Sequence, residues 1–201
     1  MKILVQKLFA SALVAIFLFS TVFTTQAAPV LGIQKVIVKG NVRVILVQKD
    51  KESVKIYDAY NPEKTSVKMD GASLMISSNE DQPITVTVFV KNLFRLEASN
   101  TSTVETSGEF NLPFLQVLLN NQAKAKLNVQ THGLYTVVKD QSRLKLRGAS
   151  EDHIVIRSKA SKLQLEDFAC SKTNSSFETL ASVLDTAKRT ALNDMAIKGQ
   201  F

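Results

Sequence analysis

A nine-residue pattern recurs four times in the second half of the chain, and it restricts the possible folds more than any other feature. Each copy has a polar turn with Asn, Asp or Lys third, a small residue fifth, and then an alternating strand. The copies begin at Ala98, Leu119, Val138 and Arg157, at spacings of 21, 19 and 19 residues. One such unit cannot bury its inward side chains alone, whereas stacked units bury them in a continuous column. The pattern predicts an all-β solenoid of stacked rungs, each of about 20 residues.

The first half of the chain has the period of two that is typical of β-strands. Short runs rich in β-formers and bounded by Asn, Asp, Gly and Pro predict strands on both sides of Gly40-Asn41 and over residues 53–57, 66–69, 73–77 and 84–90. An antiparallel sandwich would also explain this alternation, but it would not explain the regular offsets of the second half. Residues 177–192 have the three-to-four spacing of a helix, yet residues 183–191 also fit the repeat as a fifth unit.

The first residues have the three parts of a secretory signal. A basic start is followed by a short apolar run from Leu8 to Phe23 and by small residues ending in Ala27-Ala28. The run is shorter than the ~20 apolar residues of a membrane-spanning helix. We therefore expect residues 1–27 to be a cleaved signal peptide, and residues 28–201 to form one exported domain without a transmembrane segment. The expected location is the periplasm, the cell surface or the extracellular space.

Stacking the repeats predicts a basic face. In the sixth column of the pattern, cations recur on successive rungs, and two residues further on a second set falls on the same side of the sheet, where Arg147 joins after another two residues. We call these six residues the basic face: Lys124, Lys126, Arg143, Lys145, Arg147 and Lys162. Their alternates Val104, Ala125, Leu144 and Leu163 are expected to point inward.

Like charges on neighbouring strands cost stability, so their clustering favours an anionic partner such as a polysaccharide or lipid head groups. The formal net charge of +7 agrees with this choice, and the predicted signal contributes only Lys2 and Lys7 to it. Nucleic acid is not expected, because no aromatic residues alternate with the cations. The alternative is a solvated face that keeps the sheet soluble, with Glu166 and Asp167 relieving the repulsion. Exposed solenoid ends would also permit a homo-oligomer.

Signals for catalysis are weak. The chain lacks a phosphate-binding Gly-rich loop, a nucleophile elbow and a paired-His zinc motif, so neither a cofactor nor a metal is expected. Ser150-Glu151-Asp152-His153 holds the residue types of a catalytic triad, but neighbours in sequence do not give the geometry of one. Cys170 has no basic neighbour closer than Lys172 that would activate it. The principal hypothesis is a non-enzymatic binding module, and the alternative is a β-helix enzyme that acts on acidic polysaccharide with a Lys or Arg as base.

Several segments together resemble the putative auto-transporter adhesin, head GIN domain family of exported bacterial proteins. The resemblance is carried by the repeated turns and by residues 36–44, 70–76, 84–88, 93–96 and 195–199. It implies a right-handed parallel β-helix-like fold and an adhesive or surface role, and it implies no catalytic residues. The turns depart from the family's Ser-Gly type, because they carry Asn100, Asn121, Asp140 and Lys159.

Overall fold

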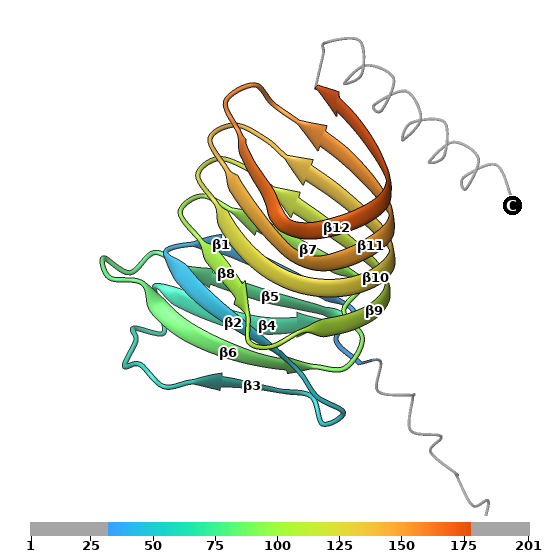
Figure 1. Ribbon diagram of the computed structural model, residues 1–201. Helices are drawn as coiled ribbons and strands as arrows, with labels where there is room; N and C mark the ends of the chain where they lie inside the picture. The colour runs from blue at the N-terminus through green and yellow to red at the C-terminus, as the bar shows by residue number, and fades with distance from the viewer. Residues whose placement is uncertain (1–31, 178–201) are drawn as a thin grey trace, which may run out of the picture. The chain divides into compact units, whose positions relative to one another are not determined.

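The computed structural model describes residues 32–177, which form a strongly curled β-sheet of twelve strands (Figure 1). No helix occurs in this range. The strands are β1 (Lys35–Gly40), β2 (Val42–Gln48), β3 (Ser53–Ile56), β4 (Thr65–Asp70), β5 (Ser73–Ser78), β6 (Ile84–Val90), β7 (Arg95–Ser99), β8 (Thr103–Thr106), β9 (Phe110–Leu119), β10 (Lys124–Val138), β11 (Arg143–Arg157) and β12 (Lys162–Phe177). The prediction of an all-β fold is confirmed for this part of the chain.

The sheet is mixed, which corrects the expectation of a wholly parallel fold. Strand β3 lies antiparallel to β6, and β4 lies antiparallel to β5, whereas the other pairs are parallel. The β4–β5 pair is a hairpin in which Asp70 faces Ser73 across Gly71-Ala72, and Gly71 has a φ of 55°. Such a short connection allows only antiparallel neighbours, because parallel strands require a long crossover.

The stacking order also differs from the order along the chain. Strand β1 pairs with both β5 and β7, and β2 pairs with both β6 and β8. The first two strands therefore lie inside the stack, between strands that follow them in sequence.

The register of the second half confirms the predicted offsets. Thr103 is the partner of Lys124, which is also the partner of Arg143, and Arg143 faces Lys162. Strands β10, β11 and β12 each run for 15 or 16 residues and curve around the core as successive layers (Figure 1). The repeats are thus stacked in hydrogen-bonded register, as the spacing predicts.

The turns between the stacked strands explain the residue types at the third and fifth positions of the repeat. Asn100, Asn121 and Asp140 have φ values of 62°, 60° and 54°, a left-handed conformation that Asn and Asp adopt more readily than other side chains. The backbone N–H of Asn121 donates to Oδ2 of Asp140 at 2.8 Å, and its side-chain amide donates to Oδ1 of Asn100 at 2.9 Å. At the fifth position, buried Ser102 and Ser161 each donate to the carbonyl three residues earlier at 2.8 Å.

The core consists of aligned apolar columns. Val44, Val104, Ala125 and Leu144 are register partners and each exposes no more than 2% of its surface. Leu163 continues the column on β12, where it is only partly buried against the core. The four predicted inward positions are therefore confirmed.

Three predictions fall outside the described residues. They are the signal at 1–27, the fifth repeat at 183–191, and the strand at 195–199. The alternative of a helix over 177–192 falls there too, except for Phe177, which ends β12. Among residues 32–177 there is no helix of sufficient length and apolar character to cross a membrane.

Candidate anion-binding face

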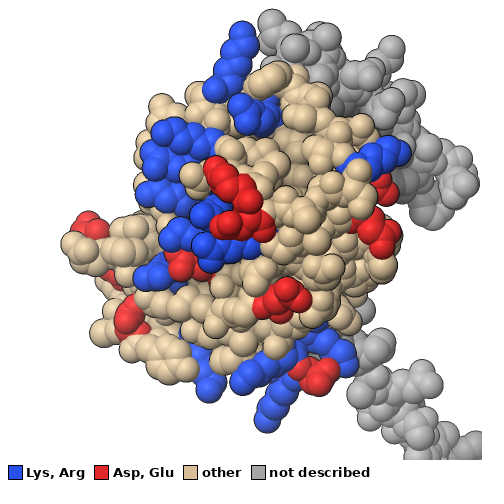
Figure 2. All heavy atoms as spheres, in the orientation of Figure 1, with Lys and Arg blue, Asp and Glu red and all other residues tan. Residues whose placement is uncertain are grey.

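The structure brings the six residues of the basic face together on the outer side of β10, β11 and β12. Lys124, Arg143 and Lys162 form one register column, and Lys126 and Lys145 are partners in the next. All are exposed except Lys145, which is half-buried. Figure 2 shows lysine and arginine side chains gathered on one side of the domain with acidic side chains among them. The predicted proximity of these cations is therefore present in the structure.

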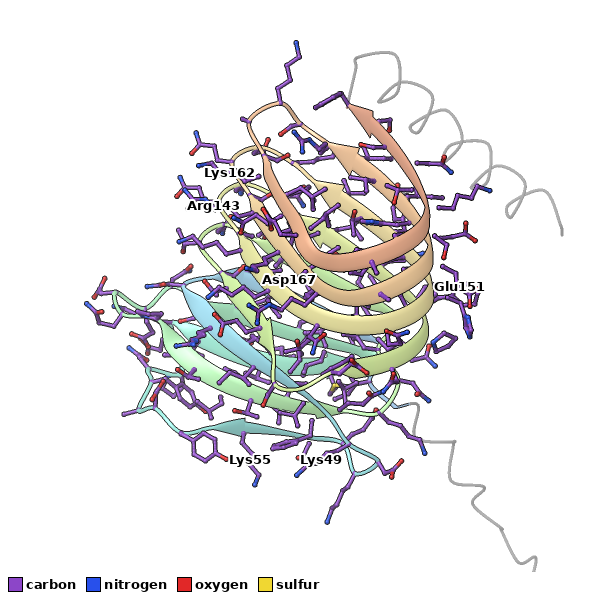
Figure 3. All side chains as sticks on the ribbon, viewed as in Figure 1. Lys49, Lys55, Arg143, Glu151, Lys162 and Asp167 are labelled. Atoms are coloured by element: carbon purple, nitrogen blue, oxygen red, sulfur yellow. The ribbon has the colours of Figure 1, made fainter. Side chains whose placement is uncertain are left out.

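The first column is a row of cations that lack acidic partners among the described residues. We call Lys124, Arg143 and Lys162 the free row, because no ion pair is formed by any of them within residues 32–177. Arg143 and Lys162 are register partners on β11 and β12, and both lie on the left side of the stacked strands in Figure 3. Adjacent strands are ~4.8 Å apart, so the three charges are closely spaced and repel one another.

The cations of the second column are ion-paired, and so is Arg147, two residues further along β11. We call Lys126, Lys145 and Arg147 the paired row, since each contacts a carboxylate. Nζ of Lys126 lies 3.2 Å from Oε1 of Glu105. Asp167 lies 3.2 Å from Nε of Arg147 and 3.6 Å from Nζ of Lys145. The expectation that Asp167 relieves repulsion is supported by these contacts.

Asp167 reaches this position through an irregularity in β12. Lys145 faces Gln164, but Arg147 faces Asp167, so one extra residue is accommodated in β12 between the two pairs. Without this shift Glu166 would face Arg147. A bulge of this kind redirects side chains at the edge of a sheet, and β12 is the last strand of the described stack.

Arg43 belongs to the same surface, and sequence reasoning missed it. It is the register partner of Thr103, and its guanidinium Nη2 donates to Oε2 of Glu105 at 3.0 Å. Arg43 lies outside the repeats, so alignment of the repeats could not find it. The alternation of Val42, Arg43 and Val44 did indicate an outward side chain.

A hollow of about 380 Å³ opens beside the paired row. It is lined by Glu105, Thr106, Lys126, Leu127, Asn128, Lys145 and Arg147. Partial burial alone would raise the pKa of Glu105, but hydrogen bonds and charge attraction from Arg43 and Lys126 outweigh it and hold that pKa below its ordinary value. A carboxylate held in its charged form by two cations is a weak proton acceptor. The hollow is therefore better suited to holding an anion than to moving a proton.

The residues from Ser150 to His153 do not form a triad. Oγ of Ser150 donates to the carbonyl of Asp152 at 2.8 Å, and Glu151 faces outward to pair with His132 at 2.8 Å. His153 points into the core, where Nε2 lies 3.0 Å from Oγ1 of Thr136. Cys170 is half-buried, with Sγ 3.3 Å from the carbonyl oxygen of Lys172. Within the described range, no three His, Cys, Asp or Glu side chains are grouped to hold a metal.

The stacked register and the ladder of turns place this chain among all-β proteins built from short sequence repeats. It belongs to the putative auto-transporter adhesin, head GIN domain family, whose model matches residues 33–195. The resemblance noted from the sequence is thus confirmed. The family name points to an exported or cell-surface protein. A comparison with curated proteins gives no match.

Solved structures share this fold at low sequence identity. A putative adhesin from Bacteroides fragilis is 12% identical, with a TM-score of 0.62, over 75% of this chain and 74% of that one. A putative lipid binding protein from Parabacteroides distasonis is 12% identical, with a TM-score of 0.54, over 75% and 76%. A putative adhesin from Parabacteroides merdae is 11% identical, with a TM-score of 0.59, over 73% of each chain. At these identities the comparison establishes the fold alone.

Proposed function

We propose that this protein is an exported, non-enzymatic, adhesin-like module that contacts an anionic polysaccharide or lipid surface through its basic face. The observation that carries the proposal is the free row. Lys124, Arg143 and Lys162 stand on adjacent strands without an acidic partner among residues 32–177. This arrangement costs stability in the isolated protein, and an anionic partner removes that cost.

The family and the structural neighbours support this class of function. Two of the neighbours are described as adhesins and one as a lipid binding protein. Lipid head groups and acidic polysaccharides both offer closely spaced anions to a row of cations, so both surfaces belong in the test. Export rests on the predicted signal, and N-terminal sequencing of the mature protein checks whether it begins at Ala28.

We further infer that the parallel strands β7 to β12 wind as a right-handed β-solenoid that presents the basic face along its side. The parallel pairs at offsets of 19 to 21 residues support this geometry. An experimental structure with left-handed connections between rungs would contradict it.

The test compares two charge reversals of equal size. Arg143→Glu with Lys162→Glu removes most of the free row, whereas Lys49→Glu with Lys55→Glu changes the net charge equally elsewhere. Lys49 and Lys55 both lie against the ring of Phe89, at 5.0 and 5.5 Å, and Figure 3 shows them far from Arg143. Retention is measured on vesicles containing phosphatidylglycerol and on immobilised polygalacturonate, each at low and high salt.

The wild-type protein and the Lys49/Lys55 variant should be retained at low salt and released at high salt, since exposed charges are screened. The Arg143/Lys162 variant should lose retention while its unfolding curve stays unchanged. If that variant is retained as well as the wild type, or if neither surface holds the wild-type protein, the basic face is a solvated surface.

A further inference from the structure

A second hollow lies on the outer surface away from the basic face, and neither the family nor the proposed function assigns it a role. Its volume is about 510 Å³. It crosses strands β9 to β12 and is lined by Asn111, Gln130, Ala149, Pro113, His132 and Glu151, among others. Glu151 projects from the opposite side of the domain to Arg143 and Lys162 (Figure 3).

Hydrogen bonds from buried side chains fix the backbone beneath this hollow. At this point each strand turns a corner, and the buried hydroxyls of Thr131 and Ser150 bond to the carbonyls that make the turn. Oγ1 of Thr131 lies 3.0 Å from the carbonyl oxygen of Pro113 and 3.1 Å from that of Gly133. Oγ of Ser150 donates to the carbonyl of Asp152. The outward side chains at the corner therefore rest on a fixed frame, as a preorganised binding site requires.

An exposed aromatic ring stands next to this hollow, on the residue that follows the lining residue Pro113. Phe114 and Gly133 are register partners on β9 and β10, and a Cβ at position 133 would lie 2.7 Å from Cδ1 and 3.0 Å from Cε1 of the ring. Only glycine therefore leaves room for the ring here. The ring meets this glycine with its Cδ1–Cε1 edge, and 57% of Phe114 is exposed, so its faces are not packed against the backbone of Gly133. An exposed ring of this size offers an apolar surface to a ligand.

The side chains that line the hollow are mostly uncharged, and they include apolar as well as polar groups. The side-chain amides of Asn111 and Gln130 form no hydrogen bond with the described residues, so their donors and acceptors are available. The titratable lining residues, His132 and Glu151, contact each other at 2.8 Å. A highly charged ligand finds no opposite charge to match here.

We propose that this hollow binds a neutral carbohydrate, with a sugar ring stacked on Phe114. Amide side chains both donate and accept hydrogen bonds, as paired sugar hydroxyls require, and an aromatic face covers the apolar C–H face of a sugar ring. Binding sites that combine one apolar platform with a few placed polar groups are typical for small ligands. This site is separate from the basic face, and the binding of a neutral sugar to it is insensitive to salt.

The experiment measures retention of the mature protein on a panel of immobilised neutral oligosaccharides of glucose, mannose and galactose at low and high salt. At least one sugar should retain the wild-type protein equally at both salt concentrations. Phe114→Ala should weaken that retention by about tenfold, as truncation of an aromatic anchor does, while Phe114→Trp should preserve it. Gln130→Ala should weaken it without changing stability.

Two control variants test whether retention depends on this hollow in particular. Tyr57→Ala removes another exposed aromatic side chain, which is 71% exposed and follows β3, and it should leave retention unchanged. Arg143→Glu should also leave it unchanged, which distinguishes this site from the basic face. The proposal is overturned if no neutral sugar retains the wild-type protein, if Phe114→Ala is retained as well as the wild type, or if Tyr57→Ala is equally impaired.

Discussion

Asp167 accepts a hydrogen bond from Nε of Arg147 at 3.2 Å, and this pairing exists only because β12 gains one residue relative to β11. The same carboxylate lies 3.6 Å from Nζ of Lys145. One acidic side chain therefore offsets two cations of the paired row. The free row next to it has no such partner among the described residues, so the charge of the basic face is unevenly distributed.

Asp167→Asn should strengthen binding to an anionic surface. The substitution frees Lys145 and Arg147 while preserving the shape of the side chain. Because the ion pairs are exposed, the free energy of unfolding should fall by less than about 1 kcal/mol. Retention on vesicles containing phosphatidylglycerol should persist to a higher salt concentration than for the wild type. Asp70→Asn changes the charge equally on the distant strand β4 and serves as the control; equal gains in both variants would contradict a local effect.

His153 should make folding stability dependent on pH. Burial lowers the pKa of His153 from 6.5 to about 4, whereas in the unfolded chain the imidazole takes up a proton below its ordinary pKa. The free energy of unfolding that the neutral, buried imidazole contributes is therefore fully present above pH 6.5. It is lost as pH falls toward 4, by roughly 3 kcal/mol in total. Urea unfolding between pH 4 and 7 measures this slope.

His153→Gln should flatten that slope between pH 4 and 6.5, because the uncharged amide takes up no proton. His132→Gln is the matched control, since His132 is exposed and its loss should leave most of the slope in place. A slope that survives in His153→Gln would assign the pH dependence to other groups.

Much of the architecture followed from the sequence because the repeats specify register directly. Once Lys124, Arg143 and Lys162 share a column, their alternates must share the inward column, and the structure places them there. The pairing around Asp167 could not be predicted in the same way, because a single inserted residue in β12 changes which side chain faces Arg147.

Other features escaped the sequence for different reasons. Strands β1 and β2 lack the nine-residue pattern, so nothing indicated that they insert between later strands, or that Arg43 joins Glu105. The hollow beside Phe114 depends on a corner in which two successive side chains stay outside the core. The alternation of inward and outward side chains breaks at this corner. In the sequence, the break is marked by Pro113-Phe114 on β9 and by Gly133 on β10.

Gly148 should tolerate no side chain. Its φ is 94°, and a Cβ there would collide with the carbonyl oxygen of Val129 on the neighbouring strand. Gly148→Ala should therefore reduce the free energy of unfolding by at least about 3 kcal/mol, through backbone strain together with steric overlap. Gly71 has a φ of 55° with open space around it, so Gly71→Ala should cost only about 1 kcal/mol. Similar losses in the two variants, measured by urea unfolding, would show that the contact with Val129 is relieved by a small movement of the strands.

Asn121 should be needed both for its backbone conformation and for its place in the ladder of turns. With a φ of 60°, Asn121→Ala incurs the left-handed penalty of about 1 kcal/mol and also loses the hydrogen bond to Asn100. Asn121→Gly loses the same hydrogen bond but adopts this conformation freely, so it should be the more stable of the two variants. The difference between their free energies of unfolding isolates the conformational cost, and the difference between Asn121→Gly and wild type reports mainly the ladder contact. If Asn121→Ala is as stable as Asn121→Gly, the turn does not require a left-handed residue, and the polar third position of the repeat must be explained by its hydrogen bonds alone.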